Sequence, residues 1–224
     1  MFAASEEWKA RYPDACFGVL IMEGVDNTGK CPALEERKDA LEQSLRTLYA
    51  GKSRKEIGAE HPFASYGRYY KTFGKNYHVL FQVESVALKE KPIFSPSPLV
   101  AVMFMAELKN LLLSAVHDLD KLKTPLFLKT AAGDESYTAM GGREVTNIPG
   151  DFLISDQEAV FSSILRGPDQ RSAISADTSR AIFMIYAPAG VEAALVADHL
   201  RDIEAYVRLA SPDAVTNMFE VRTY

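Results

Sequence analysis

The feature that most constrains the fold is an apolar stretch from Ser97 to Leu122, SPLVAVMFMAELKNLLLSAVHDLDKL. Ser97 followed by Pro98 is typical of a helix start, with an N-cap residue and a proline in the first turn. Apolar residues recur behind them at helical spacing, with charges at Glu107 and Lys109. We therefore expect one long helix over 97–122, buried against a sheet.

A small polar cluster occupies the end of this expected helix. It contains Asn110, Ser114, His117, Asp118 and Asp120. A carboxylate beside a histidine holds the imidazole in one tautomer, which suits proton transfer, so we expect the chemistry of the protein here. The structural alternative is that Asp118 and Asp120 cap the following turn and that His117 is only hydrogen-bonded there.

Composition favours a globular protein. The chain has 224 residues, of which 47% are hydrophobic and 25% charged, and we expect one domain over 1–224. No apolar run reaches membrane-spanning length and the N-terminus does not resemble a signal peptide, so we expect a cytoplasmic protein without membrane contact. Cys16 and Cys31 are too few for a disulfide framework or a zinc site. We expect no metal and no cofactor.

The net charge of −5 argues against a general nucleic-acid binder, and DNA is not an expected partner. Residues 52–91 nevertheless carry eight basic and four acidic side chains, which marks a face for a polyanion. Arg68, Lys71 and Lys75 alternate there with aromatic residues, an arrangement that suits base stacking. The alternatives are solvated helices for the charges and core packing for the aromatics, whose spacing is that of a buried helix face.

The order of elements predicts an α+β fold. Helices dominate the first half, with one early strand from Cys16 that is apolar throughout and fits burial on both faces. Short strands separated by glycine and proline turns follow Leu122, and we expect them to form a mostly antiparallel sheet. The expected fold is a layered α/β sandwich with its sheet packed by helices. The expected helices cover 6–11, a segment from Pro32 to Gly51, 52–74, 78–89 and a closing helix over 190–209.

The common catalytic motifs, such as a phosphate-binding glycine loop or a G-x-S-x-G elbow, are absent. The segments SYGRYYKTFG, AELKNLLLSAVHDLDKLKTPLFLKTAAGDESYTAMGG and GDFLISD, followed by AVFSSILRGPDQRSAISADTSRAIFMIYAP, nevertheless resemble a known domain in their order. This domain is the B3/B4 domain of the bacterial phenylalanyl-tRNA synthetase β subunit, which also exists as free-standing B3/B4 proteins. The resemblance covers a core of about 66–189, between an N-terminal strand and helix and the closing helix.

This resemblance implies an editing hydrolase that deacylates misacylated tRNA in trans, with the acceptor end of a charged tRNA as its partner. His117 matches the pocket histidine of the family, and we expect it to position or deprotonate water, with Asp120 or Asp118 holding its ring in one tautomer. The Asn110 position belongs to the pocket wall, and we expect Asp118 to contact substrate as well. Asp169 stands where the family has the acidic residue that recognises a side-chain hydroxyl.

Two alternatives stay open on the sequence. One is a non-catalytic module that binds an amino acid or tRNA in the same pocket. The other is a subunit whose partner supplies the tRNA contacts, because a chain of net charge −5 attracts tRNA weakly. The amino acid, the tRNA and the oligomeric state are not specified by the sequence.

Overall fold

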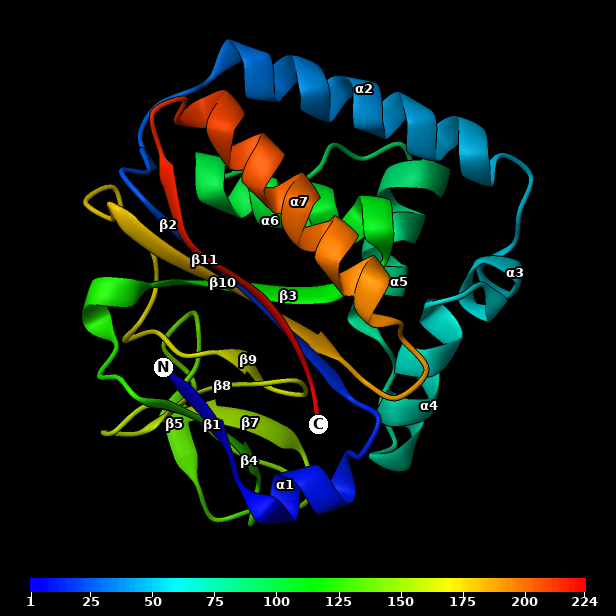
Figure 1. Ribbon diagram of the computed structural model, residues 1–224. Helices are drawn as coiled ribbons and strands as arrows, with labels where there is room; N and C mark the ends of the chain where they lie inside the picture. The colour runs from blue at the N-terminus through cyan, green and yellow to red at the C-terminus, as the bar shows by residue number, and fades with distance from the viewer.

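The computed structural model describes all residues from 1 to 224, and it confirms the predicted α+β class. Helices cover one face of a central sheet, and a second sheet covers the other face (Figure 1). No helix is both long and apolar enough to cross a membrane. The helices are α1 (Glu6–Arg11), α2 (Pro32–Tyr49), α3 (Arg54–Ala59), α4 (Phe63–Thr72), α5 (His78–Val83), α6 (Pro98–Asn110) and α7 (Ala193–Ala210).

The central sheet has four antiparallel strands in the order β11-β2-β10-β3. These are β2 (Cys16–Glu23), β3 (Leu113–Asp118), β10 (Arg180–Ala187) and β11 (Val215–Thr223). The second sheet has the order β1-β4-β7-β8-β9, and its only parallel pair is β1 with β4. Its strands are β1 (Phe2–Ala4), β4 (Leu126–Thr130), β7 (Phe152–Ser155), β8 (Val160–Ser163) and β9 (Gly167–Pro168), beside a hairpin of β5 (Ser136–Thr138) and β6 (Glu144–Thr146).

Strand β2 shows how the layers pack, and the prediction of a strand buried on both faces is confirmed. Phe17 points toward the second sheet, where its ring centroid lies 6.1 Å from that of Phe152. Its neighbour Gly18 faces α7, which comes so close that a Cβ atom at this position would lie 2.6 Å from Cγ1 of Val196. Glycine is therefore needed at position 18 for α7 to lie against the sheet.

The long helix expected over 97–122 is wrong beyond Asn110. Leu111 takes a left-handed conformation with φ of 62°, and its N–H bonds to the Glu107 carbonyl to close the helix. The chain then runs as β3, paired with β10, and makes a 3₁₀ turn over Leu119–Lys121. A short apolar run suits a buried strand as well as a buried helix, and pairing with β10 decides the outcome here.

The other predicted helices are confirmed with two changes. The segment expected as one helix over 78–89 forms α5, which continues as a π-helical turn over Glu84–Leu88. The segment expected as one helix over 52–74 forms two, α3 and α4. The aromatic residues of α4 are buried in the main core, which confirms the core-packing alternative for Phe63, Tyr66, Tyr69 and Tyr70.

The side chain of Tyr66 joins α4 to the central sheet. Its hydroxyl donates to the Tyr186 carbonyl at 2.7 Å and accepts from the Leu113 N–H at 3.0 Å. Both partners are buried, at the ends of the paired strands β10 and β3. One hydroxyl therefore satisfies two backbone groups where the pairing ends.

We expect Tyr66→Phe to lower the free energy of unfolding by about 1–3 kcal/mol, because it leaves buried backbone groups unpaired. Tyr49→Phe is the control, since the Tyr49 ring is also buried while its hydroxyl forms no hydrogen bond within the protein and is not among the buried atoms without a partner, and we expect a change within about 0.5 kcal/mol. Urea unfolding of the three proteins measures both values. Equal losses in the two variants would contradict the role assigned to Tyr66.

Candidate functional site

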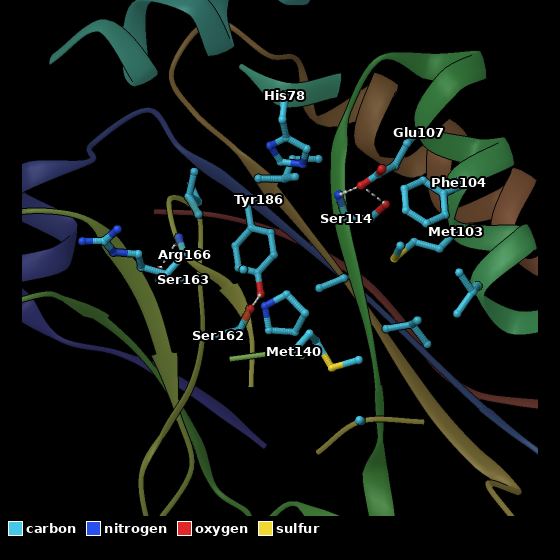
Figure 2. Close-up of a pocket in the computed structure, with 18 of the residues that line it drawn as sticks. His78, Met103, Phe104, Glu107, Ser114, Met140, Ser162, Ser163, Arg166 and Tyr186 are labelled. Carbon is cyan, nitrogen blue, oxygen red and sulfur yellow. Dashed lines mark hydrogen bonds between the residues drawn. The ribbon is translucent and has the colours of Figure 1, made fainter. Parts of the chain in front are cut away.

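A cavity of about 630 Å³ opens beside the free edge of β3. Its walls come from α5, α6, β3, β8, β9 and β10, so both sheets and two helices contribute (Figure 2). The volume lies in the range of small-molecule sites. Most of the surface is apolar, with side chains that include Phe94, Val100, Met103, Phe104, Met140 and Ile174.

The most unusual group on the cavity wall is the carboxyl group of Glu107. This side chain lies on α6 and is 2% exposed. Its Oε1 accepts from the Ser114 N–H at 2.8 Å and from the Ser114 hydroxyl at 3.2 Å (Figure 2). Burial raises its pKa to about 8, against the lowering effect of the two Ser114 bonds. At neutral pH it is therefore a carboxylic acid that can donate one hydrogen bond.

Hydroxyl groups form the polar part of the opposite wall. Tyr186 on β10 donates to the Ser162 hydroxyl at 2.7 Å, and the Ser163 hydroxyl accepts from the Arg166 N–H at 3.1 Å. The Arg166 guanidinium points away from the other labelled cavity residues (Figure 2), and its Nε donates to the Thr146 carbonyl at 2.9 Å. The cavity thus combines apolar walls with a few fixed polar groups, which is the usual composition of a binding site for an uncharged or weakly polar ligand.

His117 lies outside this cavity wall. It is completely buried on β3, with its ring edge-on to Phe161 at a centroid distance of 5.0 Å. Its Nδ1 shares a hydrogen bond of 2.6 Å with the Ser172 hydroxyl, while Nε2 has no partner. Burial lowers the pKa of His117 to about 3, and Arg171 adds to this effect, so the ring is neutral at physiological pH. Its role as a base stays a prediction.

The structure brings Asp169 together with His117 through Ser172. Asp169 is buried and accepts hydrogen bonds from the Ser172 N–H, at 3.0 Å, and from the Ser172 hydroxyl. Arg171 lies beside the same carboxylate, with Nε at 3.4 Å. This buried chain ties β3 to the segment after β9.

The remaining members of the predicted cluster lie apart from one another. Asp120 is exposed and pairs with Arg180 at 2.7 Å, and Asn110 bonds to Asp202 of α7 at 2.8 Å. Asp118 is buried, accepts from the Thr178 hydroxyl at 2.8 Å and caps the 3₁₀ turn through the Asp120 N–H. The capping alternative is therefore confirmed for Asp118. The expectation that one helix end gathers these side chains is wrong, because β3 replaces that helix end.

The basic residues predicted to meet RNA lie on or just after α4. Arg68, Lys71 and Lys75 are all exposed. Lys71 and Lys75 form no salt bridge, and Arg68 bonds only to the Ser65 hydroxyl at 2.9 Å. Lys75 precedes by three residues His78, which lines the cavity. Their contact with RNA stays a prediction.

Glu107 is the site residue that sequence reasoning missed. It lies on a mostly apolar helix between Ala106 and Leu108, which are both buried. An acidic residue on the buried face of a helix is uncommon unless it is paired, and that position was the available signal. The role of this acidic residue could not be read from the sequence, because it depends on the hydrogen bonds with Ser114. Ser114 lies opposite Glu107 only because the chain turns at Leu111.

The sequence matches no protein-family model, and no curated protein matches it. Among solved structures, the chain is similar to an N-terminal fragment of the phenylalanyl-tRNA synthetase β subunit from Pyrococcus horikoshii. The identity is 11% and the TM-score 0.49, over 97% of this chain and 54% of the fragment, so this chain spans about half of the fragment's length. These values are too low to transfer a ligand or a reaction to this chain.

The raised pKa of Glu107 predicts a pH dependence of stability that Glu107→Gln removes. Between its ordinary value of 4.5 and about 8, the folded protein keeps a proton that the unfolded chain releases. Stability therefore falls as pH rises through this window, by up to about 1.4 kcal/mol per pH unit from this group. We expect the wild type to lose stability relative to Glu107→Gln between pH 5 and pH 7.5 in urea unfolding. Parallel pH profiles would contradict a protonated Glu107.

Proposed function

We propose that this chain is a single B3/B4-like domain that takes the amino-acid part of an aminoacyl-tRNA into the cavity and hydrolyses its ester. The observation that carries the proposal is the cavity itself, whose size and apolar walls suit an amino-acid side chain. The order of motifs from Tyr66 to Ala189 supports the same class of substrate.

The proposed chemistry asks little of the protein. The ester that joins an amino acid to ribose is already activated, so its hydrolysis needs an oriented water and a proton acceptor, and the neighbouring ribose hydroxyl can assist. Glu107 and the hydroxyl groups of Ser114, Ser162 and Ser163 supply hydrogen-bonding groups on the cavity wall. The exposed cations of the α4 region, Arg68, Lys71 and Lys75, would meet phosphate groups of the tRNA.

A second candidate function is binding of the same amino-acid group without turnover. The observation that favours it is the position of His117, which is buried and absent from the cavity wall. Turnover separates the two functions.

We expect Val100→Trp to reduce deacylation at least about tenfold, because the larger ring fills the cavity that holds the amino acid. Val215→Trp is the control, since Val215 is 59% exposed on β11 at the opposite edge of the central sheet. The measurement is release of amino acid from a panel of correctly and incorrectly charged tRNAs. No release from any member of the panel would overturn the hydrolase proposal and leave the binding module.

His117→Ala tests the predicted base in the same assay, at matched concentrations of folded protein. Loss of a general base lowers a rate by about 10²- to 10⁴-fold. A loss of this size, with substrate binding unchanged, would support the predicted role. A rate equal to that of the wild type would exclude it.

A further inference from the structure

At the free edge of β3, the backbone N–H and C=O of Val116 have no hydrogen-bond partner within the protein. β3 ends the central sheet, so only one of its sides pairs, with β10. The N–H groups of Ser114 and Asp118 point to the other side, where they bond to Glu107 Oε1 and to the Ser172 carbonyl at 2.9 Å. Because backbone groups alternate along an antiparallel strand, the N–H and C=O of Val116 point the same way.

This edge faces the cavity. Ser114 and Val116 both line it, and Val116 is 8% exposed. Glu107 bonds to this edge at Ser114, near one end of β3, and the Ser172 carbonyl bonds to it at Asp118, at the other end. Val116 thus presents one donor and one acceptor, side by side, at a largely buried surface. Buried backbone groups are almost always paired, so a complementary ligand has a ready place here.

We propose that the edge of β3 at Val116 is the subsite for the main chain of an L-amino-acid amide or ester. The ligand's carbonyl oxygen accepts from the Val116 N–H, and its α-amino group donates to the Val116 carbonyl. The two bonds are those that a hydrogen-bonded pair exchanges in an antiparallel sheet. This inference rests on the proposed function and defines how the same cavity holds its substrate.

The walls next to this edge define the class of side chain. Phe104 and Met103 on α6 lie on the same side of the cavity as Glu107 and Ser114 (Figure 2). Phe94, 65% exposed, also lines the cavity and packs edge-on to Phe104 at 5.8 Å. Aromatic and thioether groups favour a large apolar or aromatic side chain. The ligand class is therefore an L-amino-acid amide or aminoacyl ester with such a side chain.

The test is a titration of ¹⁵N-labelled full-length protein with L-phenylalaninamide, followed by amide NMR. We expect the Val116 amide to show the largest downfield shift, because its N–H gains an acceptor. Phenethylamine is the matched probe, with the same ring and amine but no carbonyl group, and we expect it to leave the Val116 amide in place.

Two variants separate the backbone donor from the side chain. Val116→Pro removes the N–H, and proline is tolerated at an edge strand where the N–H points out of the sheet. Val116→Ala removes the same side-chain contacts and keeps the N–H. We expect L-phenylalaninamide to bind at least about tenfold more weakly to Val116→Pro than to Val116→Ala. The wild-type titration decides the question without a variant if Val116→Pro does not fold.

The outcomes distinguish this inference from the proposed function. Shifts at Met103 and Ile174 without a shift at Val116 would overturn the strand-edge subsite and leave ligand binding in the cavity intact. Absence of shifts throughout the cavity, up to about 10 mM ligand, would overturn amino-acid binding itself and the subsite with it.

Discussion

The structure depends on burial of the central sheet from both sides. Every residue of β10 after Arg180 is buried, and β2 is buried up to Glu23. Such strands leave no place for an unpaired polar group, because each would carry a desolvation cost. The helices can come close only where side chains are small, as at Gly18 under α7. Polar groups that could bind a ligand therefore lie at the edges of the sheet.

The cavity is a consequence of how the two edges of this sheet differ. β11 pairs with β2 along its length and ends the sheet on that side, whereas β3 ends it on the other side with no strand beyond it. The segment around Ser172 bonds to the backbone of β3 only at Asp118, and the Glu107 side chain bonds to it only at Ser114. The space between them stays open and is lined by backbone as well as by side chains. A neutral Glu107 fits this setting, since an ionised carboxylate would need a cation that the structure does not place within its hydrogen bonds.

Much of the fold could be predicted from the sequence, whereas the candidate site could be predicted only in part. Strongly periodic segments such as α2 and α7, and the apolar strand β2, were predictable because local pattern and tertiary structure agree. The segment after Asn110 was not, since a run of leucines permits both a helix and a strand. That single difference moved His117 into the interior and placed Ser114 opposite Glu107. The site is determined by which side chains of different layers lie close together. These distances depend on the pairing between β3 and β10, which no local sequence pattern reveals.

The most direct measurement of the central claim is a crystal structure with an amide analogue of a charged tRNA terminus, 3′-phenylalanylamino-3′-deoxyadenosine. The amino-acid part should lie in the cavity beside Met103 and Phe104, with its main chain on the edge of β3 and the adenosine toward solvent. Binding of the amino-acid part elsewhere, such as beside Asp120 or on the surface of α4, would contradict the assignment of this cavity as the functional site.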